Sequence, residues 1–334
     1  MFMLAGLLGL MVAGAAMVGV SSGMDAEDAE TDASAEEPSD TGTSPDTSPS
    51  QSPLDFATTP QPESTLTLSG THDADILAGS QNPDAIDAQG GDDQAHGYGG
   101  DDTLSGGTGR DDLHGGDGDD LLHGGADNDI LHGEYGQDTL RGDGGDDALW
   151  GYMDDDHLEG GTGNDSLSGG DGRDHLSGDD GADALHGGLG DDTLIGGQGA
   201  DTLFGGWGDD VLSGVDNGAV DFLNGGGGDD HITAGSGDLV DSGDGADTIT
   251  VGHWATHAAE IGDFDQTSDT LVIVYDDTAD APPVIDLVQD AEDPAALTVL
   301  MDGTEIATVR GDIDALTDSI VLKPQSNAGA LGAA

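Results

Sequence analysis

The sequence predicts an all-β protein in which a long repetitive region forms a stack of short strands and a separate β segment follows it. Three observations predict this fold class. A nine-residue period runs without insertion from Gly79 to Ser213, aspartate occupies the sixth position of all fifteen blocks, and leucine occupies the eighth position of thirteen. A chain with a short fixed period builds one structural unit many times and stacks the copies.

Two segments precede the repeats. Residues 1–20 carry no charge and are long enough to span a bilayer, so we expect an N-terminal hydrophobic helix. They lack the basic residues of a secretory signal, although Ala13-Gly14-Ala15 resembles a cleavage site. The sequence therefore leaves open an uncleaved membrane anchor, a cleaved signal, or neither. Residues 21–64 are rich in Ser, Thr, Pro, Asp and Glu, which predicts a disordered acidic linker.

The charge of the chain predicts that its partner is a cation. Among 334 residues, 70 are acidic and 5 are basic, and the formal net charge is -65. Such a chain repels itself unless positive charge is supplied from outside. Nucleic acid is excluded as a partner because its phosphates are bound through clustered Lys and Arg. There is no cysteine, which excludes disulfides and thiolate metal sites. Oxygen or imidazole must therefore hold the cation.

The repeats bury too little apolar surface to fold unaided. One leucine per block contributes about 1.5 to 3 kcal/mol, whereas ordering nine residues costs about 9 to 18 kcal/mol. If residues 18 apart lie one strand spacing apart, about 4.8 Å, their carboxylates repel by about 3.5 kcal/mol at a dielectric constant of about 20. Calcium between them reverses this effect, because it accepts carboxylates together with the carbonyls that flexible glycine turns can present. Magnesium and zinc fit such oxygen-rich, irregular sites less well.

The block G-G-x-G-x-D-x-L-x, as in GGTGNDSLS and GGLGDDTLI, resembles the nonapeptide of the RTX family, the haemolysin-type calcium-binding repeats. The resemblance extends from Gly70 to about Val251. It implies a right-handed parallel β-roll, in which the glycine-aspartate half is a turn, x-L-x is a short strand, and 18 residues make one coil. We therefore expect an RTX β-roll over residues 65–251.

The resemblance also implies that the sixth-position aspartates are side-chain ligands of multiple Ca²⁺ ions, in two rows of alternating blocks. The predicted ligands are Asp84, Asp93, Asp102, Asp111, Asp120, Asp129, Asp138, Asp147, Asp156, Asp165, Asp174, Asp183, Asp192, Asp201, Asp210, Asp221, Asp230 and Asp247. Some blocks depart from the pattern. Tyr152 and Asp154 replace glycines, which makes the calcium sites of that block less regular. Ala88 and Ala95 replace the usual glycine and leucine, which suggests a degenerate first coil. Two extra residues lie within 214–224.

Residues 252–334 are expected to form a C-terminal β cap. Segments such as LTVLMDG and TEIATVRG alternate like strands, and Asp302-Gly303 predicts a hairpin turn between them. A repeat stack needs its open end covered. The segment also resembles the C-terminal flank of RTX proteins, where a type I exporter reads a secretion signal. This export route leaves the hydrophobic residues 1–20 unexplained.

Other candidate sites are weaker. No stretch fits the EF-hand template, and no G-K-[ST] phosphate loop is present. His96, His114 and His132 are spaced by 18 residues, so they should stack on one outer face. They either bind zinc or nickel or simply face solvent, and solvent exposure is preferred because the ninth position accepts many residue types. His253 and His257 lack the glutamate of a zinc protease, so a structural role is expected.

These observations predict a bacterial calcium-binding repeat protein that is not an enzyme. It is expected outside the cell or on its surface, where it folds on extracellular calcium and acts as a structural or adhesive module. The alternative is an accessory module that binds an acidic polysaccharide, another cell-surface ligand or a partner enzyme through calcium. A type I exporter and, through residues 1–20, a membrane are the further expected partners.

Overall fold

The computed structural model describes residues 65–215, 218–278, 281–289, 293, 295–312 and 316–327. The predicted hydrophobic helix and acidic linker lie outside these residues. Within the described part of the chain, no helix is long and apolar enough to cross a membrane.

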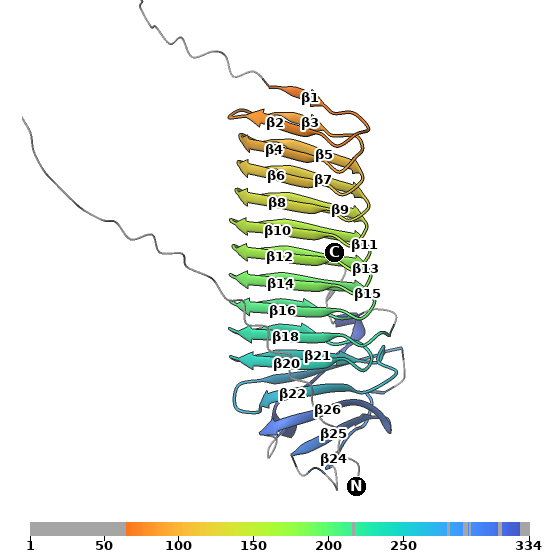
Figure 1. Cartoon of the computed structure of the whole chain (residues 1–334). Coiled ribbons are helices and arrows are strands. Elements are labelled where there is room, and N and C mark those ends of the chain that lie inside the picture. The colour runs from red at the N-terminus through yellow and green to blue at the C-terminus, as the bar shows by residue number, and fades with distance from the viewer. Residues whose placement is uncertain are drawn as a thin grey trace, which may run out of the picture. The chain divides into compact units, whose positions relative to one another are not determined.

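The described residues form two stacked β-sheets whose strands alternate along the chain, as Figure 1 shows. Sheet A has thirteen strands, all paired in parallel. In spatial order they are β1 (Thr67–Ser69), β3 (Ala85–Asp87), β5 (Thr103–Thr108), β7 (Leu121–Ala126), β9 (Thr139–Gly144), β11 (His157–Thr162), β13 (His175–Asp180), β15 (Thr193–Gln198), β17 (Val211–Ser213), β19 (His231–Thr233), β21 (Thr248–Gly252), β23 (Thr270–Tyr275) and β27 (Ile320–Pro324).

Sheet B has fourteen strands. In spatial order they are β2 (Ile76–Ser80), β4 (Gln94–Gly99), β6 (Asp112–Asp117), β8 (Ile130–Tyr135), β10 (Ala148–Met153), β12 (Ser166–Asp171), β14 (Ala184–Leu189), β16 (Thr202–Trp207), β18 (Phe222–Gly227), β20 (Leu239–Asp244), β22 (Ala259–Asp265), β26 (Thr304–Asp312), β25 (Ala296–Met301) and β24 (Ile285–Gln289). The predicted all-β parallel roll is therefore confirmed.

The leucines of the eighth position form the core between the two sheets. Leu104 lies opposite Leu122 in the neighbouring parallel strand, which is the 18-residue register that the period predicts. Both side chains are fully buried, as are the equivalent leucines of the other coils. One aliphatic side chain per nonapeptide therefore fills the interior, and the outward residues on either side of it are free to vary.

The strands are longer than the three-residue x-L-x segments that the family resemblance implied. Most span six residues and continue through the glycines that open the next block. Gly107 still pairs with Gly125 although both have left-handed φ angles, 106° and 116°. Parallel pairing with the neighbouring coil therefore continues past the bend at the second block position, which only a left-handed residue can make.

The irregular spacing after Ser213 is absorbed without a break in either sheet. Leu203 pairs with Leu223, 20 residues later, and Leu223 pairs with Val240, 17 residues later. The two residues that would locate the bulge, 216 and 217, lie outside the described residues. The aspartates before these strands keep their place in the stack, so the insertion changes the loop and not the coil.

The C-terminal segment extends both sheets before it closes one of them. β22 and β26 add parallel strands to sheet B, and β23 and β27 add parallel strands to sheet A. An antiparallel meander, β24–β25–β26, then forms the end of sheet B. Asp302 and Gly303 turn between β25 and β26 with φ angles of 52° and 81°, which confirms the predicted hairpin. Two short 3-10 helices, Leu316–Asp318 and Gln325–Asn327, flank β27.

Candidate metal centres

The aspartates of the sixth block position lie in the turns immediately before the strands, and all eighteen predicted ligands are buried, with at most 3% exposure. Because the turn is the same in every coil, the side chains align in two rows, one along each edge of the roll. One row begins with Asp84 and Asp102, and the other with Asp93 and Asp111. The structure thus brings the predicted residues together as two linear arrays.

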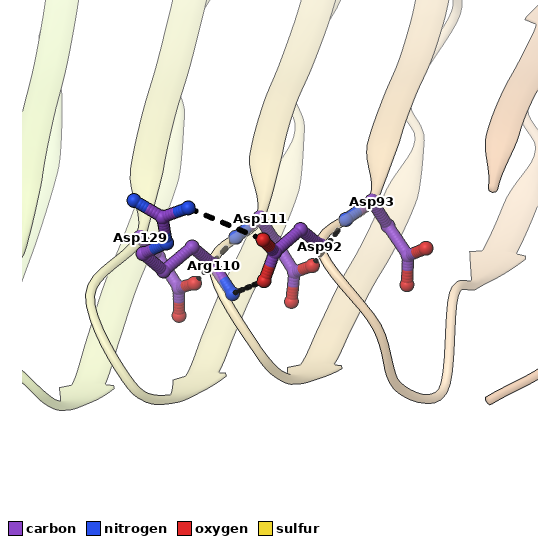
Figure 2. A network of polar contacts seen from close by, with 5 residues as sticks. All are labelled: Asp92, Asp93, Arg110, Asp111 and Asp129. Atoms are coloured by element: carbon purple, nitrogen blue, oxygen red, sulfur yellow. Dashed lines mark hydrogen bonds and ion pairs between the residues drawn. The ribbon is translucent and has the colours of Figure 1, made fainter. Parts of the chain in front are cut away.

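One carboxylate oxygen of each aspartate holds neighbouring coils together. The backbone N–H of Asp102 donates to Oδ1 of Asp120 at 2.7 Å, and the N–H of Asp120 donates to Oδ1 of Asp138 at 2.8 Å. Figure 2 shows the same ladder in the other row, where Asp93 donates to Asp111 and Asp111 to Asp129. We call these two arrays the aspartate ladders. Each step links one coil to the next.

The other oxygen, Oδ2, is buried without a hydrogen-bond partner in most ladder aspartates. These residues are Asp93, Asp102, Asp111, Asp120, Asp129, Asp138, Asp147, Asp156, Asp165, Asp174, Asp183, Asp192, Asp210, Asp230 and Asp247. Buried polar atoms normally have partners, and an unpaired buried charge is costly. Burial, and then the neighbouring aspartates of the row, raise the pKa of Asp129, Asp138 and Asp156 to about 8. Among the described residues, fifteen equivalent carboxylate oxygens therefore receive no hydrogen bond or positive charge from the protein.

The space beside Oδ2 depends on the glycine that opens each block. A Cβ added to Gly97 would lie 2.1 Å from Oδ2 of Asp102, and a Cβ added to Gly151 would lie 2.1 Å from Oδ2 of Asp156. A Cβ on Gly109 would meet the carbonyl oxygen of Gly91 at 2.1 Å, so this carbonyl points toward the next coil. Carboxylates and carbonyls brought together by glycines suit an oxygen-seeking cation of flexible coordination, which is the chemistry of calcium.

The ladders continue beyond the predicted ligands. Asp75 precedes the first predicted residue, Asp238 follows Asp221, and Asp269 follows Asp247, each accepting or donating the same ladder bond. Asp75 keeps the nine-residue phase, in the block Gly70–Ala78, but it was not included among the predicted ligands. Asp238 and Asp269 were missed because the phase is lost after Ser213. A signal was present: each is followed by x-Leu or x-Val, as in Asp75-Ile76-Leu77.

The ends of the ladders have their own hydrogen-bond donors. Oδ2 of Asp75 accepts the N–H of Thr71 at 2.7 Å, and Oδ2 of Asp269 accepts the N–H of Asp265 at 2.7 Å. Asp84, which was predicted as a ligand, accepts the Ser80 N–H at Oδ2, 2.6 Å, besides the ladder bond at Oδ1. At these positions a backbone N–H from four residues earlier in the chain occupies the oxygen that is unpaired along the middle of the ladder.

The irregular blocks keep ladder geometry. Asp156 donates to and accepts from its neighbours in the row although Tyr152 and Asp154 replace glycines, because both residues adopt the left-handed conformation, with φ angles of 82° and 74°. In the block with Ala88 and Ala95, both alanines are fully buried and the coil is intact. The substitutions are therefore compensated locally.

A second set of aspartates, at the fifth block position, faces solvent and links the coils in the opposite direction. Asp92 accepts the backbone N–H of Arg110 from the next coil at 3.1 Å, and the Arg110 guanidinium lies 3.2 Å from its carboxylate (Figure 2). Asp155 and Arg173 repeat this pair. Exposed ion pairs contribute little to stability. These two arginines, among the five basic residues of the chain, pair with exposed aspartates and so do not neutralise the buried ladder carboxylates.

His253 and His257, expected to be structural, lie among polar groups of the cap region. His257 Nδ1 is 3.2 Å from the hydroxyl of Thr256 and 3.4 Å from that of Ser236, and His253 contacts the ring of Trp254 edge-on. Among the described residues, neither belongs to a group of three metal-ligating side chains.

The model of the RTX calcium-binding nonapeptide repeat matches residues 69–104, 96–131, 123–158, 132–167, 150–185, 159–194, 186–218 and 215–249. These segments overlap and together cover residues 69–249, more than half of the 334 residues. A search of curated proteins found no match. The matches coincide with the coils that carry the two aspartate ladders. The chain therefore belongs to the RTX calcium-binding nonapeptide repeat family, and its repeats bind multiple calcium ions.

Proposed function

We propose that the protein is a secreted or cell-surface module whose β-roll folds when it meets the high calcium concentration outside the cell. The observation that carries this proposal is the row of buried, unpartnered Oδ2 atoms. Without calcium, the folded state holds these carboxylates away from water and close to one another, and the unfolded chain avoids both costs. At low calcium the chain therefore stays unfolded and can pass through an exporter.

The folded module acts as a structural or adhesive element. The twelve spacings between the thirteen strands of sheet A correspond to a length of roughly 58 Å at about 4.8 Å per spacing. Residues 21–64 are proposed as the acidic spacer, residues 1–20 as an anchor or signal, and the C-terminal segment as the part recognised by a type I exporter. RTX repeats are typical of secreted proteins, which supports the extracellular location. The proposal includes no catalytic step.

A calcium titration of the full chain tests the proposal. Circular dichroism and small-angle scattering are expected to show a cooperative gain of β structure together with a fall in radius as Ca²⁺ is added. Mg²⁺ at the same concentrations should produce neither change, because it demands a tighter octahedron and keeps its waters. A roll that is already compact in chelator would contradict the proposal.

A second candidate function, calcium-dependent binding of an acidic polysaccharide, is favoured by a hollow on the outer face of sheet B. The hollow has a volume of about 470 Å³, and its lining includes Ser168, Asp171, Leu189 and Trp207. Trp207 is 69% exposed, an unusual position for a large aromatic side chain that offers an apolar face to a sugar ring. Calcium would bridge the acidic ligand to this acidic surface.

A pull-down with acidic polysaccharide separates the two functions. Retention that requires calcium and is lost in Trp207→Ala, but kept in Tyr98→Ala, supports the binding module. Tyr98 is the matched control because it is 52% exposed on the same face of sheet B. Equal loss in both variants, or retention in chelator, would contradict it.

A further inference from the structure

The outer face of sheet B carries a column of stacked rings that calcium binding does not explain. The rings of His96 and His114 have centroids 4.5 Å apart, those of His114 and His132 are 4.4 Å apart, and Trp150 stacks on His132 at 4.9 Å. The ninth block position of β4, β6, β8 and β10 supplies these side chains. Stacking is what the 18-residue spacing predicts, and it brings imidazoles from adjacent coils to one place.

A carboxylate joins two of these imidazoles. Ligand atoms of Asp112, His114 and His132 all lie within 4.8 Å of one another, and this is the one such group of three among the described residues. Oδ1 of Asp112 is already 3.1 Å from Nε2 of His114. A tetrahedral metal holds its ligand atoms about 3.3 Å apart, so the most distant pair must approach by at most about 1.5 Å, a movement that partly exposed side chains can make.

The opposite nitrogens of both imidazoles have partners that fix the rings. Nδ1 of His114 is 2.9 Å from Oε1 of Glu134, and Nδ1 of His132 is 3.1 Å from the hydroxyl of Tyr152. Imidazoles that bind metals commonly make such a bond at the second nitrogen, which orients the first toward the metal. Nε2 is then the ligand atom of each histidine, on the side of Asp112.

The backbone holds these two partners at a cost. Glu134 and Tyr152 occupy the second block position, where β6, β12, β14, β16 and β18 of sheet B have glycine and β4 has Tyr98. Their φ angles are 85° and 82°, a conformation that side chains other than glycine rarely adopt. Gln89, Tyr98, Asp143 and Asp179 adopt the same conformation at this position in other coils, so the turn imposes it. In β8 and β10 the residues at this position place a carboxylate and a hydroxyl against the histidines.

We propose that Asp112, His114 and His132 form a binding site for a divalent transition-metal ion of the Zn²⁺ class, separate from the calcium sites. Glu134 and Tyr152 are positioning residues that orient the two imidazoles. Imidazole and carboxylate are zinc ligands, and water completes the tetrahedron. Because the ligands come from strands β6 and β8 of adjacent coils, the site exists only when the roll is folded, and the metal fastens the two coils on their outer face.

The test is a Zn²⁺ titration of the full chain in saturating calcium, with a competing chromogenic chelator as the readout. The wild type is expected to bind one Zn²⁺ more tightly than any other. His132→Ala should weaken this binding by about 100-fold or more, and Glu134→Gln and Tyr152→Phe by about 10- to 100-fold. Co²⁺ in place of Zn²⁺ should give the visible absorption of a tetrahedral histidine-ligated ion, which His132→Ala abolishes.

His175→Ala is the matched control, because His157 and His175 stack in the same way, 4.9 Å apart, on sheet A. It should bind Zn²⁺ like the wild type. Every variant is first shown to reach the wild-type circular dichroism in calcium, so that loss of the fold is not mistaken for loss of the site. Unchanged Zn²⁺ affinity in His132→Ala, an equal loss in His175→Ala, or displacement of the tight Zn²⁺ by excess calcium would each overturn the proposal.

Discussion

Replacing one ladder aspartate in the middle of the roll isolates the contribution of the buried oxygen. In Asp138→Asn, the amide oxygen can still accept the Asp120 N–H that Oδ1 accepts now, at 2.8 Å. Only the charge and the unpartnered Oδ2 are lost. Asp119→Asn is the matched control. Its carboxylate is exposed and accepts the Gln137 N–H at 3.0 Å, so the same charge and the same kind of hydrogen bond are involved.

The expected shift in the calcium midpoint follows from the binding energy lost at one site, divided among all the ions that bind on folding. Burial and neighbouring aspartates raise the pKa of Asp138 from 3.8 to about 8, so keeping it ionised without a cation costs about 6 kcal/mol. Removing one partner from a buried ionic contact costs about 3 to 5 kcal/mol. With one ion for each of the fifteen unpartnered aspartates, this loss is about 0.3 kcal/mol per ion. The calcium midpoint of cooperative folding should therefore rise about 1.5-fold.

A calcium titration followed by circular dichroism measures this midpoint. Combining Asp120→Asn, Asp138→Asn and Asp156→Asn should raise it about 3- to 4-fold, because three equal shifts multiply. Asp119→Asn should leave it within error of the wild type. If Asp138→Asn had no more effect than Asp119→Asn, the buried oxygen would not be a calcium ligand.

Three further predictions concern the metal-free roll, the leucine core and the glycine that opens each block. In chelator, stability should fall as the pH rises from about 4 to 8, because burial raises the pKa of ladder carboxyls, to about 8 for Asp156, and the folded state then binds more protons than the unfolded state. Circular dichroism should show more β structure at about pH 5 than at about pH 8, and equal signals would refute this. Leu140→Ala should lower the free energy of unfolding in calcium by about 2 to 5 kcal/mol, because the side chain is fully buried, whereas Ile130→Ala, 42% exposed on the outer face, should change it by less than about 0.5 kcal/mol in chemical denaturation. Gly151→Ala should raise the calcium midpoint because its Cβ would lie 2.1 Å from Oδ2 of Asp156. Gly99→Ala, in which the nearest contact of the new Cβ is 3.4 Å away, should not raise it. Similar midpoints in the two variants would show that the ion does not bind beside the glycine that opens the block.

The period made the coil predictable. A nine-residue phase held over fifteen blocks fixes the register of the strands between Gly79 and Ser213, so their inward leucines and aligned aspartates follow directly. The different surroundings of the two oxygens of each carboxylate were not predictable, because Oδ1 accepts a backbone N–H from the neighbouring coil and Oδ2 does not. Asp238 and Asp269 were missed for a related reason: their ladder neighbours are 17 and 22 residues away, and no fixed period finds them.

The side chains around the histidine column lay beyond sequence reasoning for a different reason. The spacing of His96, His114 and His132 predicted the stack. It could not predict that Glu134 and Tyr152 would adopt left-handed conformations and reach back across a strand. Position in the block identifies the face that a residue occupies. The residue that its side chain contacts on the neighbouring strand depends on side-chain length, as in Glu134 with His114 and Tyr152 with His132.

The two oxygens of a ladder aspartate have opposite effects on the metal-free fold. Oδ1 accepts an N–H from the preceding coil, which favours stacking, while Oδ2 is buried by the same stacking and opposes it. In the proposed calcium-dependent folding, a cation at Oδ2 removes the second effect and leaves the first, so no separate switch element is needed. At the ends, Oδ2 of Asp75 accepts the N–H of Thr71, and Oδ2 of Asp269 accepts the N–H of Asp265 at the end of β22. These two oxygens therefore have protein donors where those along the middle of the ladders have none, and the end turns need no ion at them.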